Sequence, residues 1–135
     1  CVHLGLTPQS VNVFGGYKIQ GRGDAAAEKL LTDAKSVVEA GAALLVLECV
    51  PAELAKAVTE AVAVPVIGIG SGAATDGQVL VMHDMLGMVH GRVPRFVHDF
   101  LTDERNSARS IEGAFALYQQ SVREGSFPTE QHQFS

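Results

Sequence analysis

The segment Ala43–Pro51 is nearly all apolar and contains one charged side chain, Glu48, close to its carboxyl end. An unbroken apolar run of this length is typical of a parallel strand that is covered on both faces. In parallel sheets, the carboxyl ends of the strands border the ligand-binding crevice. The pattern therefore predicts that Glu48 stands rigidly at such a crevice, partly removed from water, as a general base requires.

Hydrophobic periodicity assigns most of the remaining chain. It predicts strands at Val2–Leu6, Ala43–Leu47 and Val64–Gly70, and helices at Asp24–Gly41, Ala52–Val62, Arg95–Leu101 and Ser107–Glu124. Asp24 is predicted to cap the first helix, and Thr7–Gly23 is predicted to be a long glycine-rich loop. The segment Thr75–Gly87 can be interpreted in two ways, because Thr75 and Gln78 have capping-box spacing while the apolar residues 79–82 would also suit a buried strand. We favour a helix there.

The order of strands and helices indicates βα units around a parallel sheet. Three or four such units make half of an eight-fold (β/α)₈ TIM barrel, which normally needs about 250 residues. A half barrel would expose two sheet edges, and exposed edges pair readily with other chains. We therefore expect residues 1–125 to form about half of one barrel domain, the other half to come from sequence outside this chain, and residues 126–135 to form a loose polar tail.

Composition excludes several classes of function. The net charge of −5 argues against nucleic acid as a partner, and no apolar run approaches the roughly 20 residues of a membrane span. The two cysteines lack metal-site spacing and the sequence shows no secretory leader, so we expect free thiols and a cytoplasmic location.

Two residues are the main candidates for chemistry. Glu48 could be a general base at a barrel mouth, or a strand-end carboxylate held in a structural ion pair. His3 could donate a hydrogen bond to a ligand oxygen, or be a half-buried histidine without a role in binding. If the first two strands are neighbours, the two side chains open onto the same face of the sheet.

Weaker motifs have simpler explanations. Gly68–Ala73 fits a loose dinucleotide-binding pattern, but a tight turn that allows close backbone approach is favoured. The tripeptide Arg22–Asp24 is an RGD sequence, for which a loop charge and a helix cap are favoured over adhesion. His83, Asp84 and His90 lack the spacing of a helical metal site, so surface or structural roles are favoured.

Several segments together closely resemble a known enzyme family, the ketopantoate hydroxymethyltransferases, over the carboxyl-terminal half of its members. They are His3–Gln9, Phe14–Lys18, Gln20–Gly23, Leu45–Cys49, Pro65–Gly70 and Thr75–Gln78. The resemblance implies a (β/α)₈ barrel of the phosphoenolpyruvate/pyruvate type. It also implies transfer of a hydroxymethyl group from 5,10-methylenetetrahydrofolate to 3-methyl-2-oxobutanoate, giving ketopantoate on the route to pantothenate and coenzyme A. Members of the family are cytoplasmic, Mg²⁺-dependent and typically decameric.

The resemblance also implies roles for both candidate residues. Glu48 falls on the proton-acceptor position of the family, and His3 on a histidine that lines the substrate pocket. The Mg²⁺ ligands and a substrate-binding lysine lie in the amino-terminal half of the family, so no metal ligand is expected in this chain. Mg²⁺ bound to the keto acid would stabilise an enolate formed when Glu48 removes a proton. Two alternatives stay open: a non-catalytic barrel half that assembles with a partner, and a related barrel enzyme acting on another keto acid.

Overall fold

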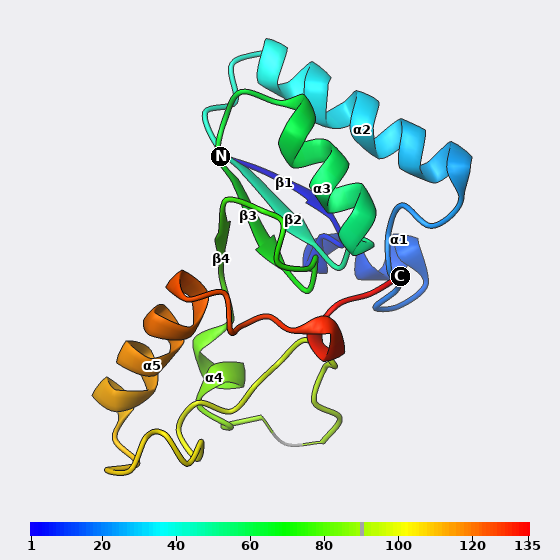
Figure 1. Ribbon diagram of the computed structural model, residues 1–135. Helices are drawn as coiled ribbons and strands as arrows, with labels where there is room; N and C mark the ends of the chain where they lie inside the picture. The colour runs from blue at the N-terminus through cyan, green and yellow to red at the C-terminus, as the bar shows by residue number, and fades with distance from the viewer. Residues whose placement is uncertain (90) are drawn as a thin grey trace.

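The computed structural model describes residues 1–89 and 91–135, so the metal-ligand candidate His90 lies outside the described residues. The described chain contains a parallel four-stranded sheet in the order β1 (Val2–Gly5), β2 (Leu45–Glu48), β3 (Val66–Ile69) and β4 (Gly77–Gln78). Its helices are α1 (Val11–Phe14), α2 (Asp24–Glu39), α3 (Ala52–Ala61), α4 (Met82–Met85) and α5 (Ile111–Arg123), with 3₁₀ turns η1 (Pro8–Ser10) and η2 (Glu130–His132) (Figure 1). The α/β class, the parallel sheet and the first three strands are confirmed. A closed barrel is not formed by the described residues.

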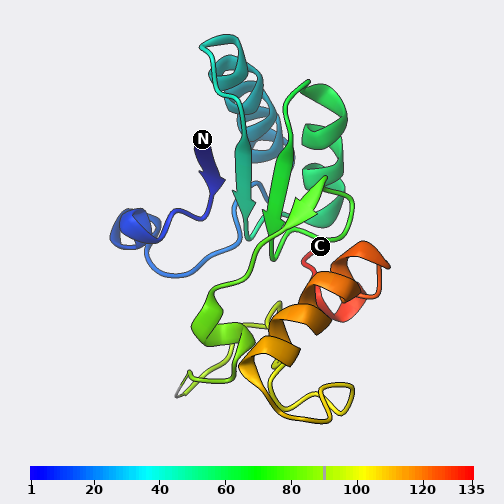
Figure 2. The ribbon, with the colours of Figure 1, turned by 90° about the vertical axis from the view of Figure 1, so that its left-hand side faces the viewer.

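One face of the sheet forms the first hydrophobic core. Leu45, Leu47 and Val66 are fully buried there, and they pack against the apolar faces of α2 and α3. Figures 1 and 2 show these two helices together on the same side of the strands. Leu30 and Ala34 are the buried α2 residues of this core, four residues apart as helical periodicity requires.

The opposite face of the sheet is only partly covered. Along β2 the buried residues Leu45 and Leu47 alternate with the partly exposed Val46 and Glu48. The expectation that this strand is covered on both faces is therefore wrong for the described chain. Burial along β2 alternates with the period of two that distinguishes the faces of a strand. The uniformly apolar sequence does not reveal this alternation.

The second hydrophobic core lies beyond the carboxyl ends of the strands, where α4 and α5 are found (Figures 1 and 2). Phe100 and Met85 are its most deeply buried large side chains, and the Phe100 ring makes edge contacts with the rings of Tyr118 and Phe127. This core fixes the irregular chain between α4 and α5 against the end of the sheet. No helix of the described residues combines the length and the apolar character needed to cross a membrane.

The helix predicted for Thr75–Gly87 is wrong over most of its length. The side-chain amide of Gln78 donates to the Gly72 carbonyl (2.9 Å) and to Thr75 Oγ1 (2.8 Å), and Thr75 Oγ1 donates to the Gly77 carbonyl (2.9 Å). The two residues with capping-box spacing therefore close a turn instead of capping a helix. The two-residue strand β4 follows, and only Met82–Met85 are helical.

Residues 95–101 form a turn and extended chain in place of the predicted short helix. Asp99 accepts hydrogen bonds from the backbone amides of Leu101 (2.9 Å) and Thr102 (3.2 Å), which competes with helical pairing. The terminal helix begins at Ile111 instead of Ser107, because Ser110 caps it by accepting from the Gly113 amide (2.9 Å). Both differences arise from short polar side chains that bond to nearby backbone groups.

Two further expectations also need correction. Gly23 is the N-cap of α2 and makes no side-chain cap, so Asp24 is the first helical residue. The segment after Ser126 is docked, because Phe127 is buried and Phe134 contacts the ring of Phe96. The Phe134 carbonyl also accepts a hydrogen bond from the Ala52 amide (2.9 Å), which ties this segment to the start of α3.

Candidate active site

Glu48 is the last residue of β2, as predicted, and is paired in register with Gly5 of β1 and Ile69 of β3. Its carbonyl accepts from the Leu6 amide (2.8 Å), so the backbone is fixed at the point where the side chain leaves the sheet. Cys49 follows with φ of 51°, which is uncommon for a residue other than glycine. The chain thus turns sharply directly after the carboxylate, at the carboxyl end of the sheet.

Ser71 stabilises this turn through side-chain hydrogen bonds to the backbone. Its fully buried hydroxyl donates to the Leu47 carbonyl (2.9 Å) and accepts from the Val50 amide (3.3 Å). The two backbone groups stand on either side of Glu48 and Cys49. Sequence reasoning treated Ser71 as an ordinary member of a glycine-rich turn and missed this contact across more than 20 residues.

Glu48 lines a cavity of about 960 Å³. Leu6, Ile69 and Phe96 supply buried apolar surface, and Asp84 of α4 is a second carboxylate in the lining. Sequence reasoning assigned Asp84 only a surface or structural role. The cavity therefore combines apolar walls with two acidic groups, one from the sheet and one from the helix beyond it. Four cationic side chains also line it, those of Lys18, Arg22, Arg92 and Arg95.

Burial of the Glu48 side chain raises its carboxyl pKa, and the negative charge of Asp84 raises the pKa further. A raised pKa makes the ionised carboxylate a stronger proton acceptor. The neighbouring Cys49 thiol has a pKa raised to about 12 by burial and then by the charge of Glu48. The thiol is therefore protonated at neutral pH and is a poor nucleophile.

His3 lies beside Glu48, as the sequence predicted for neighbouring strands. Its Nε2 atom is 3.1 Å from Glu48 Oε2, although the orientation does not make a hydrogen bond and Nε2 is buried without a partner in the described chain. Burial lowers the pKa of His3, which favours the neutral imidazole. His3 contacts Glu48 but does not itself line the cavity among the described residues.

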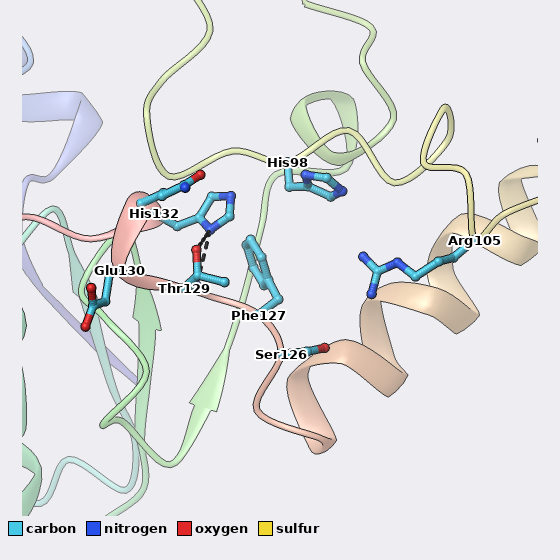
Figure 3. Close-up of a pocket in the computed structure, with 8 residues that line it drawn as sticks. His98, Arg105, Ser126, Phe127, Thr129, Glu130 and His132 are labelled. Carbon is cyan, nitrogen blue, oxygen red and sulfur yellow. Dashed lines mark hydrogen bonds between the residues drawn. The ribbon is translucent and has the colours of Figure 1, made fainter.

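A second cavity, of about 560 Å³, lies between the docked carboxyl-terminal segment and the loop before α5 (Figure 3). His98 and Arg105 line it, but both are paired with Asp103, at 2.7 Å from its Oδ2 atom. His132 Nδ1 is also engaged, by Thr129 at 2.8 Å. Since His98 and Arg105 are already paired, we do not assign a reaction to this cavity.

The remaining motifs have structural roles. Gly70 adopts φ of +63° at the end of β3, and a side chain there would collide with the Phe96 ring. A strand follows this turn, so the helix amino terminus that dinucleotide binding requires is not there. Among residues 1–89 and 91–135, no three His, Cys, Asp or Glu side chains are grouped to hold a metal ion.

Comparison with known proteins decides the family. The sequence model described as ketopantoate hydroxymethyltransferase matches residues 1–130. This chain belongs to that family. Two proteins named 3-methyl-2-oxobutanoate hydroxymethyltransferase illustrate the similarity. The one from Psychrobacter cryohalolentis is 88% identical over 135 residues, which are 100% of this chain and 51% of that protein. The one from Yersinia enterocolitica is 60% identical over 134 residues, which are 99% of this chain and 49% of that protein.

The chain thus spans about half the length of the curated ketopantoate hydroxymethyltransferases that it matches. Their names identify them as transferases. Family membership confirms the resemblance found in the sequence, and it agrees with the parallel sheet of the described residues.

Proposed function

We propose that Glu48 is the general base of a ketopantoate hydroxymethyltransferase site that this chain helps to build. The carboxylate would remove a proton from the carbon next to the keto group of 3-methyl-2-oxobutanoate, the compound in the relatives' names. The observation that carries this proposal is a carboxylate at a strand end, facing a cavity, with a raised pKa. Position and proton affinity are the two properties that general-base catalysis requires.

His3 is proposed to act beside Glu48. A neutral imidazole whose Nε2 is buried without a hydrogen-bond partner can donate to an oxygen of the keto acid or its product. Its distance of 3.1 Å from Glu48 also allows it to hold the carboxylate in place once the imidazole turns towards it. Substrate binding by His3 is thus part of the same proposal.

Other parts of the reaction are assigned to residues outside this chain. The described residues provide no fitting set of metal ligands, so no Mg²⁺ ligand and no metal-dependent step is assigned to them. The proposal retains 5,10-methylenetetrahydrofolate as the one-carbon donor, Mg²⁺ held by the other barrel half, the pantothenate route, a cytoplasmic location and a homo-oligomer. The open edges β1 and β4 and the partly covered sheet face suit assembly with further sequence.

The test is Glu48→Gln in the assembled enzyme. Replacing the carboxylate by an isosteric amide should slow exchange of the substrate C–H proton with D₂O by about 10²–10⁴-fold, the usual contribution of a general base. NMR measures this exchange without the folate donor, so it isolates proton removal. Glu53→Gln, which neutralises an exposed carboxylate on α3, is the matched control.

Near-normal exchange in Glu48→Gln would reject the assignment of the base. If proton exchange is unchanged in Glu48→Gln and this chain is required only for the enzyme to assemble, the alternative of a non-catalytic barrel half is favoured. If the C–H protons of other keto acids exchange with D₂O as fast as those of 3-methyl-2-oxobutanoate, the alternative of a related barrel enzyme is favoured.

A further inference from the structure

His132 is the last residue of the 3₁₀ turn η2, and its ring closes that turn (Figure 3). The Nδ1 atom lies 3.2 Å from the Thr129 backbone nitrogen and 2.8 Å from Thr129 Oγ1. A hydroxyl group can donate or accept a hydrogen bond, whereas a backbone amide can only donate. The amide therefore requires a lone pair on Nδ1, so the docked turn contains His132 as a neutral imidazole.

Protonation of His132 breaks this arrangement. A proton on Nδ1 faces the Thr129 N–H, so a hydrogen bond becomes a contact between two donors. The hydroxyl can still accept from the charged ring, but the amide cannot change its role. The neutral ring acts like the Glu or Gln of a capping box, which accepts from the amide of the first residue of the motif. The charged ring cannot act in this way.

The basic groups that face His132 oppose its protonation. His98 lines the same cavity, with its ring centroid 6.0 Å from that of His132, and Arg95 donates to the neighbouring Gln131 carbonyl (2.8 Å). Burial, followed by the charges of His98 and Arg95, lowers the pKa of His132. Glu130 is the acid of the same turn, but its side chain is exposed, so its charge is screened by water.

Arg105 and Asp103 are the remaining charged groups beside this cavity. Asp103 Oδ2 lies 2.7 Å from Arg105 and also 2.7 Å from His98 Nε2, so this carboxylate is already engaged by two partners. Among the residues that the structure describes, no carboxylate lies within ion-pair distance of His132. A positive charge on the His132 ring would therefore have no counter-ion there.

The turn η2 lies in the middle of the docked segment that follows α5. Before it, the buried Phe127 packs against the His132 ring, with the ring centroids 4.9 Å apart. After it, Phe134 lines the Glu48 cavity, and its carbonyl accepts from the Ala52 amide (2.9 Å). The turn thus connects an anchor in the second core with a wall of the cavity.

We propose that His132 is a pH-sensitive latch, whose neutral ring keeps residues 127–135 docked and whose protonated ring loosens them. The docked state binds fewer protons than the undocked state. Docking is therefore fully stabilised above the ordinary histidine pKa of about 6.5. This stabilisation is lost as pH falls through the lowered pKa of the docked ring. Mild acid then loosens one wall of the cavity without altering a residue of the proposed chemistry.

Amide hydrogen exchange of the assembled enzyme, followed by mass spectrometry, tests the latch. On acidification from about pH 7.5 to about pH 5.5, the charge of a histidine changes while most other side chains keep theirs. After correction for intrinsic rates, the amides of residues 127–135 should exchange about 3- to 10-fold faster, the usual effect of losing a helix cap. The amides of β2 should keep their protection, because the latch does not contact that strand.

His132→Gln is the decisive variant, because its side-chain carbonyl can accept from the Thr129 amide but does not titrate. Its protection should be the same at both pH values. His132→Ala removes the acceptor and should leave the segment loosened at both. His83→Gln, which removes an exposed histidine of α4, is the matched control and should retain the response of the unmodified enzyme.

An equal response to acid in His132→Gln and the unmodified enzyme would overturn the proposal, as would an unmodified enzyme that does not respond. Rapid exchange of the glutamine variant at both pH values, or full protection of the alanine variant, would also reject the role of Nδ1 as the acceptor.

Proton exchange of the keto acid provides a second measurement. The rate of the unmodified enzyme relative to His132→Gln should fall on acidification, and this ratio cancels the titration of Glu48 that both proteins share. The amide measurement does not involve the keto acid, so it tests the latch even if Glu48 is not the base. Loss of the amide response with normal base behaviour would reject the latch alone.

Discussion

The Ser71 hydroxyl gives the sharpest test of how the site is positioned. In Ser71→Ala, the Leu47 carbonyl loses a donor at 2.9 Å, and the Val50 amide loses its acceptor at 3.3 Å. Ser71 and Val50 are fully buried, so water cannot replace the hydroxyl without rearrangement. A lost hydrogen bond costs about 0.5–1.5 kcal/mol, and a buried amide without a partner costs about 1–3 kcal/mol. The free energy of unfolding should therefore fall by about 2–3 kcal/mol.

Differential scanning calorimetry of the assembled enzyme measures this change. For a protein of roughly 150–250 residues, each kcal/mol lowers Tm by about 2–4 °C, so we expect a decrease of about 4–12 °C. Ser107→Ala, which removes an exposed hydroxyl, should change Tm by less than about 1–2 °C. The proton exchange catalysed by Glu48 should also slow, because its backbone would no longer be held from both sides. A Tm equal to that of the unmodified enzyme would refute the argument that this hydroxyl stabilises the turn.

Two further predictions concern groups beside the site. At pH 8 a thiol reagent should modify exposed Cys1 rapidly and Cys49 only after unfolding. The reason is that burial and the charge of Glu48 raise the Cys49 pKa to about 12. Rapid labelling of both thiols in the folded protein would contradict this prediction. Because the folded-state pKa of Glu48 is raised, the folded state binds more protons, and its stability relative to Glu48→Gln should fall as pH rises above the unfolded value of about 4.3. Thermal unfolding at pH 4 and pH 7 measures this, and a constant difference in Tm would exclude a raised pKa.

The regular elements could be predicted because their signals are local. The apolar spacing along α2 and α3 and the apolar runs of β1, β2 and β3 each contain enough residues to define a period. The adjacency of His3 and Glu48 was also predictable from parallel neighbouring strands, since His3 pairs with Val46 and Glu48 lies two residues further on, on the same face of the sheet. The carboxyl end of β2, at Glu48, could therefore be predicted from the sequence to within one residue.

The missed features depend on contacts between distant or competing groups. Gln78 and Asp99 bond to nearby backbone and prevent helices that spacing alone favours. Ser71 meets Leu47 and Val50 only after the sheet has formed, so no local pattern marks it. Asp84 likewise enters the cavity because the second core positions α4 beyond the strands. Long-range placement of polar groups is what the sequence pattern could not supply.

The docked carboxyl-terminal segment has a practical consequence. Phe134 forms part of the wall of the cavity that contains Glu48, and the backbone around it is tied to α3 and to Arg22. A protease cut or a shortened gene product ending near residue 126 would therefore remove part of the cavity wall together with the buried Phe127 of the second core, although it removes no acid–base group of the proposed chemistry. Expression designs that treat this stretch as expendable should be checked for loss of folding as well as for loss of ligand binding.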